Sequence, residues 1–419
     1  MKRVLLGLLL AAQILWPAKS EARVTIGPHA AQEPTGFVTA WATTLDAAEP
    51  ENLATGKKPR TQYETVDLAL SGTQVRLRFS NILNVKRLDI VEASIASVSN
   101  GKAVGKRLAL SFGRRRGTMI SPGEATFSDP MKLLVRAGDR LSISFTLRQS
   151  LEEAPLHDIT LDPPATSDSG ESASGSGTRP SDRAQPWRLV DRVLVNPRQA
   201  ANVAIAIGDS LTDGDGDIST KRETWPWIVS KTLSERLIVL NLGRAGSRLE
   251  RDGLGISGLK RLRSDGLTIQ HLKYVFLEFG LNDLGFPGVT LGSKLLETPA
   301  RAPSGQELER AFTKAIAMTH QRAICVVIAT LPPFHDADFP GYFSEGKESA
   351  RQQLNAWIRH AAPADAVMDI DESLRDPTSP TRLREAFKSR DGLHPNRLGQ
   401  KVMAQTALEA FNKAKAKCG

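Results

Sequence analysis

Two different hydrophobic patterns divide this chain, and the change between them constrains its fold more than any other feature. From Arg23 to Leu147, apolar and polar residues alternate in short runs such as 75–79 (VRLRF) and 141–145 (LSISF), separated by turn residues. Such alternation predicts half-buried antiparallel strands. From Asn202 onward, continuous apolar runs alternate with helical segments, as in a parallel sheet covered on both faces. We therefore expect an all-β sandwich, jelly-roll-like, at residues 23–160 and an α/β domain at residues 187–419.

The second part of the chain has a regular order of predicted elements around a core at residues 202–413. Strands are expected at 203–207, 237–240, 275–279, 324–331 and 367–370, and helices at 225–235, 306–319, 345–360 and 398–413. This order predicts a doubly wound parallel sheet whose reactive groups gather beyond the carboxyl ends of the strands. Residues 161–186 are rich in Ser and Gly and are expected to form a flexible linker or loop. Residues 187–195 are expected to add one more strand before the second domain begins near Pro197.

The first 22 residues have the pattern of an export signal. Lys2 and Arg3 precede an apolar run from Val4 to Trp16, and small residues suited to cleavage follow up to Ala22. The apolar run is shorter than the roughly 20 residues that span a bilayer as a helix. We therefore expect a signal peptide, no transmembrane segment, and a mature protein in the periplasm or outside the cell.

Charge and cysteine content add weaker constraints. The formal net charge is +9, and the basic residues around Arg115 and between Arg244 and Arg263 lack interleaved aromatic residues. We expect no nucleic-acid partner, and attraction to anionic polysaccharide or a membrane surface is a weaker alternative. Cys325 lies in an apolar run, which favours a buried thiol. The sequence leaves open a disulfide between Cys325 and Cys418 after export.

A serine stands directly after the first predicted strand of the α/β domain. The apolar run 204–207 is followed by Gly-Asp-Ser-Leu-Thr-Asp-Gly, which places Ser210 where a nucleophile can lie, next to Asp209. The α/β-hydrolase elbow requires glycine two residues after the serine, but Thr212 occupies that position, so a different serine-hydrolase architecture is implied. Taken alone, the motif also fits a turn in which Ser210 caps a helix.

A carboxylate and an imidazole lie three residues apart near the C-terminus. Asp391 and His394 belong to the run DGLHPN, which precedes an amphipathic helix. An imidazole titrates near neutrality and is suited to remove the proton of a serine hydroxyl. A carboxylate that accepts the other ring N–H stabilises the imidazolium that forms. The alternative is an ordinary turn that leads into a helix.

Two further turns offer hydrogen-bond donors after predicted strands. Gly246 ends the run NLGRAG after the strand at 237–240, and Asn282 lies in the run GLND after the strand at 275–279. Acyl transfer requires donors where the carbonyl oxygen becomes negative, and a glycine N–H and an asparagine amide both qualify. Both residue types are also common in ordinary turns.

In this order, the four segments resemble the SGNH (GDSL) hydrolase family over residues 202–411. The resemblance implies a flavodoxin-like three-layer α/β/α domain with a parallel sheet. It implies that Ser210 is the nucleophile, that His394 is first base and then acid, and that Asp391 orients the imidazole. This mechanism requires no metal and no cofactor.

The same resemblance implies an oxyanion hole made by the backbone N–H groups of Ser210 and Gly246 and the side chain of Asn282, with Asp209 in a supporting position. Ser247 departs from the pattern, because close relatives often carry asparagine there. The N-terminal part is similar to the β-rich module found ahead of some secreted members, through the runs 75–81 (VRLRFSN) and 127–130 (FSDP).

These features predict a secreted serine esterase that hydrolyses carboxylic esters through an acyl-enzyme. Export together with a β-rich module favours an acylated carbohydrate, such as an O-acetylated polysaccharide, as the substrate. A lipolytic esterase or lysophospholipase acting on lipid is the alternative enzyme. A glycan-binding protein with an idle hydrolase domain is the alternative that is not an enzyme.

Three other signals favour ordinary structural roles. The acidic run 213–217 (DGDGD) begins like a calcium loop but lacks its later glycine and glutamate, so a solvated loop near the site is expected. His335 with Asp336 is expected in a loop near the site rather than as a second base. Trp225 and Trp227 are expected to pack a helix against the core more than to stack on a sugar.

Overall fold

The computed structural model describes residues 32–48, 61–99, 102–157, 165–167, 187–291, 294–295 and 301–419. The expected signal peptide at residues 1–22 lies outside the described residues, as does the expected linker at 161–186 except for its short strand at 165–167. Within the described part of the chain, no helix combines the length and apolar character needed to cross a membrane.

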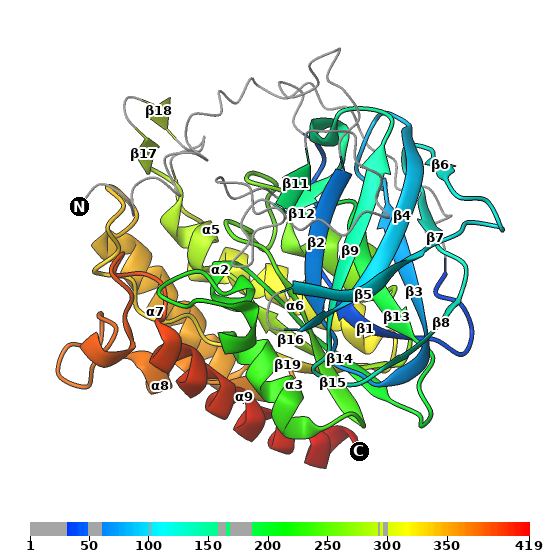
Figure 1. Ribbon diagram of the computed structural model, residues 1–419. Coiled ribbons are helices and arrows are strands. Elements are labelled where there is room, and N and C mark those ends of the chain that lie inside the picture. Colours follow the sequence, from blue (N-terminus) through cyan, green and yellow to red (C-terminus); the bar gives the residue numbers. More distant parts are fainter. Residues whose placement is uncertain are drawn as a thin grey trace.

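Two large antiparallel sheets and the two-stranded pair β10-β12 form the N-terminal part of the structure, which we call the β module (residues 32–195; Figure 1). One sheet has the order β1-β13-β3-β7, with β8 also paired to β3, and the other has the order β11-β2-β9-β4-β5, with β6 paired to β4. Between them, Phe79 and Phe145 are fully buried and meet edge to face. The expected β-rich part is therefore confirmed. The strands are β1 (Val38–Ala42), β2 (Thr61–Asp67), β3 (Gly72–Ser80), β4 (Leu88–Ser99), β5 (Lys102–Ala109), β6 (Thr118–Ile120), β7 (Ala125–Phe127), β8 (Met131–Val135), β9 (Arg140–Leu147), β10 (Leu156–His157), β11 (Ala165–Ser167), β12 (Trp187–Arg188) and β13 (Val190–Val195).

Strand β13 corrects the domain boundary expected at residue 187. It lies between β1 and β3, where Val193 is in register with Trp41 on one side and Leu77 on the other. Residues 187–195 therefore belong to the β module, and the extra strand expected before Pro197 is a central strand of its sheet. All six residues of β13 are buried, including the charged Asp191 and Arg192, so the strand lacks the apolar–polar alternation that marks runs such as 75–79.

A five-stranded parallel sheet is the centre of the C-terminal part, the α/β domain (residues 197–419). Its strand order is β15-β14-β16-β19-β20, which is the order 2-1-3-4-5 of flavodoxin-like folds. The strands are apolar almost throughout because both faces of the sheet are covered, and every residue of β19 is buried. The expected fold is confirmed. The strands are β14 (Asn202–Gly208), β15 (Leu237–Gly243), β16 (Leu272–Glu278), β19 (Cys325–Ala329) and β20 (Ala366–Met368).

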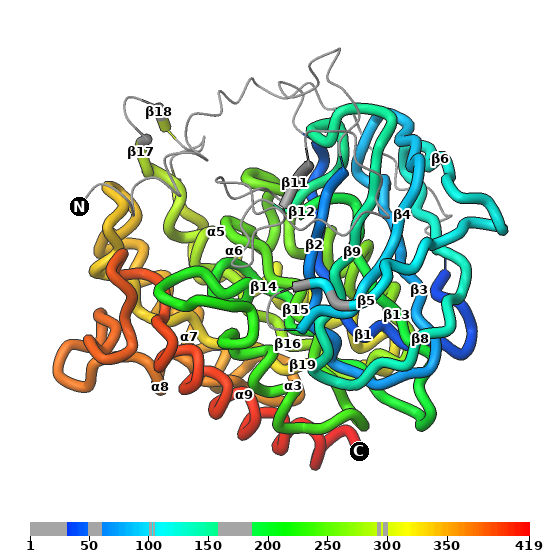
Figure 2. Tube along the Cα trace, viewed as in Figure 1, coloured from blue at the N-terminus to red at the C-terminus, as the bar shows by residue number. Residues whose placement is uncertain are grey.

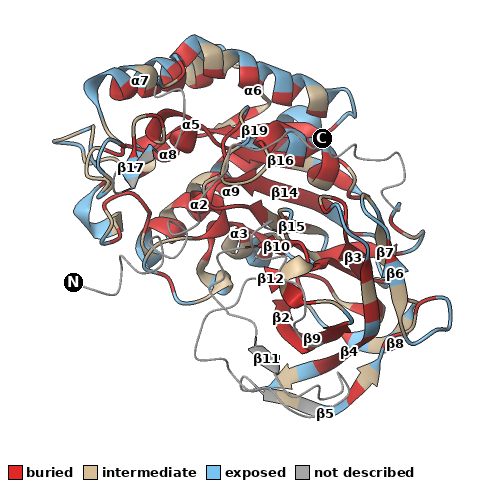
Figure 3. Cartoon of the chain, turned by 90° about the horizontal axis from the view of Figure 1, so that it is seen from above, coloured by how far each residue is buried: buried red, intermediate tan, exposed pale blue. Residues whose placement is uncertain are grey.

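Helices cover both faces of this sheet and complete three layers, with their buried sides turned toward the strands (Figure 3). One face packs against α3, α8 and α9, and there Phe276 meets Trp225 edge to face. The other face packs against α4, α6 and α7, through residues such as Phe312 and Leu354. The helices are α2 (Ser210–Asp213), α3 (Trp225–Leu233), α4 (Gly258–Arg261), α5 (Leu281–Gly285), α6 (Gly305–His320), α7 (Glu345–His360), α8 (Ile370–Leu374) and α9 (Arg397–Cys418).

The β module and the α/β domain share one hydrophobic core. The buried cluster that contains Leu77 and Phe79 of the module also contains Ile205 and Leu240 of the parallel sheet. Strand β1 lies beside β15, the edge strand of that sheet (Figure 2). The module is therefore packed against the α/β domain along its edge, close to the ends of the strands where the candidate residues lie.

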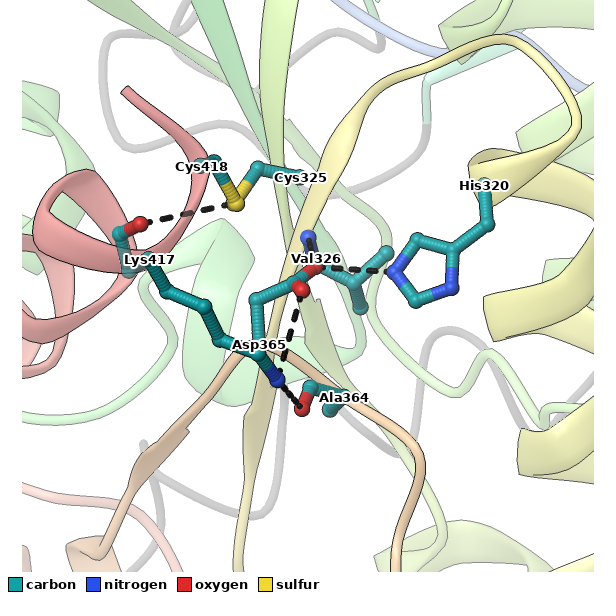
Figure 4. Close-up of a disulfide and its surroundings, with 8 residues drawn as sticks. His320, Cys325, Val326, Ala364, Asp365, Lys417 and Cys418 are labelled. Atoms are coloured by element: carbon teal, nitrogen blue, oxygen red, sulfur yellow. Dashed lines mark hydrogen bonds and ion pairs between the residues drawn. A yellow bond between two sulfur atoms is a disulfide. The ribbon is translucent and has the colours of Figure 1, made fainter.

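Cys325 and Cys418 form a disulfide bond (Figure 4), which corrects the expectation of a buried free thiol. The bond joins the first residue of β19 to the last residue of α9, whose Cα atoms are 6.3 Å apart across a sequence separation of 93 residues. The sequence left this pairing open because only the fold brings the end of the chain back to the start of β19. A cross-link over so long a segment restricts the unfolded chain.

Candidate active site

The carboxyl ends of three neighbouring strands bring the predicted residues to one edge of the sheet. Gly208, the last residue of β14, lies level with the last residues of β15 and β16 in the parallel register. The turns that follow these strands carry Ser210, Gly246 and Asn282. The strand order therefore places all three turns side by side, as expected for a doubly wound sheet.

Ser210 begins the one-turn helix α2 directly after β14. The carboxylate of Asp209 caps this helix by accepting a hydrogen bond from the backbone N–H of Leu211 at 3.0 Å. Glycine is required at position 208, because a Cβ there would overlap the backbone and side chain of Glu278. Only 6% of Ser210 is exposed, so its hydroxyl lies in a place from which most water is excluded.

Ser210, His394 and Asp391 form a continuous hydrogen-bonded chain. The Nε2 atom of His394 lies 2.9 Å from Ser210 Oγ, and its Nδ1 atom lies 2.7 Å from Asp391 Oδ2. The other carboxylate oxygen of Asp391 accepts the backbone N–H groups of Leu393 and His394, both at 2.9 Å. Because the carboxylate is an acceptor, Nδ1 carries the ring hydrogen, and Nε2 offers a lone pair to the serine hydroxyl.

The charges around His394 favour its protonated form. Burial lowers the pKa of His394, but the hydrogen bond and charge of Asp391 outweigh burial and raise it above its usual 6.5. Burial raises the pKa of Asp391, yet its contacts with His394 prevail and lower that pKa to about 2. The result is an ionised carboxylate beside the imidazole, an arrangement that favours the protonated form of His394.

Asn282 binds the loop of Gly246 through the next residue, Ser247. Gly246 has a φ of 74°, a conformation that favours glycine. The side chain of Asn282 donates from Nδ2 to the backbone carbonyl of Ser247 at 3.1 Å and accepts a hydrogen bond from the hydroxyl of Tyr342 at 2.9 Å. The departure from the family pattern at Ser247 leaves this contact intact, because the bond uses its main-chain oxygen.

Tyr342 is a residue of the site that the sequence did not reveal. It is buried, and its hydroxyl fixes which end of the Asn282 amide faces the loop of Gly246. Gly285 provides the space for its ring, since a Cβ at that position would overlap the aromatic atoms. No motif surrounds Tyr342, and it meets Asn282 only through the fold, so the sequence held no signal for it.

Asp209 belongs to a pair of buried carboxyl groups behind the nucleophile. Burial, followed by the charge of Glu278, raises the pKa of Asp209 well above its usual value. Burial also raises the pKa of Glu278, which accepts a hydrogen bond from Thr212 Oγ1 at 2.8 Å. A proton held between the two groups avoids two adjacent buried charges. Asp209 thus supports the serine turn through its cap and through this pair.

The acidic run 213–217 is held by protein groups. Asp213 contacts His157 and Lys221, and Asp217 accepts the backbone N–H of Arg390 at 3.1 Å. Among the described residues, the group with metal-ligand proximity consists of Cys325, Asp365 and Cys418. Both of its sulfur atoms are joined in the disulfide.

The remaining signals lie around the site or in the core. The loop that contains His335 and Asp336 borders the site, since the backbone N–H of Asp338 donates to the carbonyl of Asp391 at 2.8 Å. Trp225 is fully buried against the sheet. Trp227 lies under the guanidinium of Arg222 and lines a small cavity between the β module and β15.

Comparison with known proteins assigns this domain to a family. Residues 206–402 match the GDSL-like Lipase/Acylhydrolase family. Similar solved structures include an aryl esterase from M. smegmatis, with 16% identity over 51% of this chain and 100% of that chain and a TM-score of 0.40. They also include a carbohydrate acetylesterase from Sinorhizobium meliloti, with 14% identity over 50% of this chain and 98% of that chain and a TM-score of 0.39.

A search among curated proteins gave no match. The family match begins inside β14 and covers the segments that carry Ser210, Gly246, Asn282, Asp391 and His394. The α/β domain of this chain therefore contains a GDSL-like lipase/acylhydrolase domain at residues 206–402, and the protein is a carboxylic ester hydrolase.

Proposed function

We propose that this protein is a serine esterase that works through an acyl-enzyme, with Ser210 as nucleophile, His394 as base and Asp391 as its orienting partner. The observation that supports this proposal is the hydrogen-bonded chain from Asp391 through His394 to Ser210, with 2.7 and 2.9 Å between the bonded atoms. Such a chain transfers the hydroxyl proton to the imidazole as the serine oxygen attacks.

In the first step, Ser210 Oγ attacks the ester carbonyl, and its proton passes to His394 Nε2. The negative oxygen of the tetrahedral intermediate accepts hydrogen bonds from the N–H groups of Ser210 and Gly246 and from the amide of Asn282. The intermediate collapses when His394 returns the proton to the leaving alcohol. Water, deprotonated by His394, then releases the acid and restores Ser210.

For the substrate, we propose an ester of a carbohydrate, with acetyl as the acyl group. An open depression at the start of α9 supports a polar leaving group, because it is lined by Asp217, Asn396, Arg397, Leu398 and Lys401. Asn396 is two residues from His394, and a Cβ on Gly216, the neighbour of Asp217, would lie 3.1 Å from the Cβ of His394. Hydroxyl-rich groups hydrogen-bond to such a surface, whereas an acyl chain of a lipid gains nothing from it.

We propose that the protein acts after export, in the periplasm or outside the cell. The N-terminal sequence pattern supports this location. The disulfide between Cys325 and Cys418 also supports it, since such bonds persist in oxidising compartments.

The first experiment measures p-nitrophenol release from esters of increasing acyl length by the mature protein and by its Ser210→Ala variant. We expect activity with acetyl esters and a loss of about 10⁶-fold in kcat for the variant, because removal of the nucleophile abolishes the acyl-enzyme route. Equal activity of the two proteins would show that Ser210 is not the nucleophile. A maximum at long acyl chains would indicate the lipolytic alternative, and retention on polysaccharide without hydrolysis would indicate a binding protein.

A further inference from the structure

Two side chains of the β module, Asp46 and His157, reach the turns that carry the reacting groups. They leave the module side by side, because Asp46 forms an antiparallel bridge with Leu156, the residue before His157. The two backbone hydrogen bonds of this bridge measure 2.7 and 3.0 Å. This one β-bridge therefore orients both side chains toward the α/β domain.

Asp46 binds the loop that contains Gly246. Its carboxylate accepts a hydrogen bond from Arg244 Nε at 2.6 Å and forms a second ion pair with the fully buried Arg261. The backbone of Arg244 holds both ends of this loop, since its N–H donates to the carbonyl of Gly208 at 3.1 Å and its carbonyl accepts from Ser247 at 3.0 Å. Gly246 lies inside that turn, directly before Ser247.

The ion pairs of Asp46 are strong enough to hold it as a charged group in the interface. Burial raises the pKa of Asp46, but Arg261 and Arg244 outweigh burial and lower it to about 2. The side chain of Arg244 is itself only 6% exposed. If the carboxylate is replaced by a neutral group, a buried guanidinium beside the loop loses its ion pair with Asp46.

His157 binds the turn that contains Ser210. The imidazole lies between two oxygen atoms, with Nδ1 2.9 Å from the carbonyl of Thr44 in the module and Nε2 2.9 Å from Asp213 Oδ2. Asp213 is the last residue of α2, which begins at Ser210. The same carboxylate oxygen accepts the backbone N–H of Ala245 at 3.4 Å. His157 thus supports a carboxylate that joins the serine turn to the loop of Gly246.

We propose that Asp46 and His157 of the β module are positioning residues for ester hydrolysis, which hold the Gly246 loop and the Ser210 turn at the separation that the oxyanion requires. The inference rests on the proposed serine mechanism and assigns the module a part in it. Neither residue touches the substrate. Donors that are displaced by about 1 Å lose on the order of 100-fold in rate, so small movements of this loop matter.

The test compares Asp46→Asn with a matched control at the other end of the sheet. Glu33 is also a buried carboxylate of the module, and it binds Arg192 at 2.7 Å and accepts the backbone N–H of Gln270 at 2.9 Å. Gln270 precedes the amino end of β16, whereas the candidate site lies beyond the carboxyl ends. Glu33→Gln therefore makes the same chemical change in the same interface, away from the reacting groups.

We expect Asp46→Asn to lower kcat about 10- to 100-fold with an acetyl ester, while KM changes less than about threefold, because the transition state depends on the loop more than the bound ester does. Glu33→Gln should keep kcat within about twofold of the wild type. His157→Phe, which keeps a ring but neither nitrogen, should resemble Asp46→Asn. Equal losses of kcat in Asp46→Asn and Glu33→Gln would overturn the proposal, since the effect would then be one of general stability.

Hydrogen exchange on the folded full-length variants tests the same idea without turnover. Asp46→Asn should raise amide exchange in peptides that cover residues 243–250, and Glu33→Gln should leave those peptides unchanged. Unchanged exchange there in Asp46→Asn would overturn the positioning role. This readout separates the two claims, because an inactive wild-type protein would contradict the esterase proposal and would leave the exchange result to decide whether the module holds the loop.

Discussion

The two ends of the parallel sheet bind the β module through similar contacts with different consequences. At the amino ends, Glu33 accepts the backbone N–H of Gln270 and pairs with Arg192 inside the module, while the disulfide of Cys325 joins β19 to α9. At the carboxyl ends, Asp46 pairs with Arg244 beside the glycine loop. Both ends bury charge and both stabilise the fold. Only at the carboxyl end do these contacts reach the groups that we propose for the reaction. The position of an ion pair, more than its strength, should therefore determine how much activity is lost when it is removed.

The sharpest way to test this comparison is to change Asp391 at the carboxyl end. Asp391→Asn should reduce kcat by about 10⁴-fold, because the amide no longer fixes the imidazole tautomer or stabilises the imidazolium. The loss should be smaller than that of Ser210→Ala. Steady-state kinetics with an acetyl ester measures both variants, and near-normal turnover in Asp391→Asn would remove Asp391 from the mechanism.

The pH profile of kcat/KM gives the same substitution a second readout. His394 must be neutral to accept a proton, and its pKa is raised, so activity should fall as the pH drops through a value above 6.5. Asp391→Asn removes the main group that raises this pKa and leaves burial, which lowers it, so the acid limb should move to lower pH. If the acid limb of Asp391→Asn stays at the pH of the wild type, a group other than Asp391 controls the pKa that this limb reports.

A smaller loss is expected when one oxyanion donor is removed at the same end. Asn282→Ala should lower kcat about 10²- to 10³-fold, which is the usual effect of one such donor. Tyr342→Phe keeps the ring and the amide but removes the hydroxyl that orients Asn282, so it should lower kcat by less. Circular dichroism controls for the fold, and wild-type kcat in Asn282→Ala would contradict its place in the oxyanion hole.

The smallest effect on turnover is expected at the amino ends of the strands. Cys325→Ser with Cys418→Ser removes the disulfide far from the triad, so kcat should stay close to that of the wild type. The melting temperature should fall, since a cross-link across a long segment contributes about 2–5 kcal/mol of stability. A large drop in kcat at a temperature where the variant is fully folded would erase the difference between the two ends of the sheet.

The sequence predicts those parts of the structure whose signals are local. The turns of Ser210, Gly246 and Asn282 each follow a strand, and the parallel sheet brings such turns together. The Asp391–His394 pair is a short motif directly before the amphipathic helix α9. Tyr342, Asp46 and His157 have no local signal, because their partners lie 60, 198 and 56 residues away. The place of β13 and the disulfide depend on the same long-range assembly, and both differ from the expectations.

The position of β13 in the middle of its sheet determines where the gene for this protein can be divided without disrupting the β module. Residues 32–157 supply both neighbours of β13, but β13 itself enters the chain only after residues 161–186. A gene segment that ended before that point would encode a sheet with a missing centre, and one that began there would encode a strand with nothing to pair with. The module therefore ends only after β13, and recombination within residues 161–186 would break its sheet.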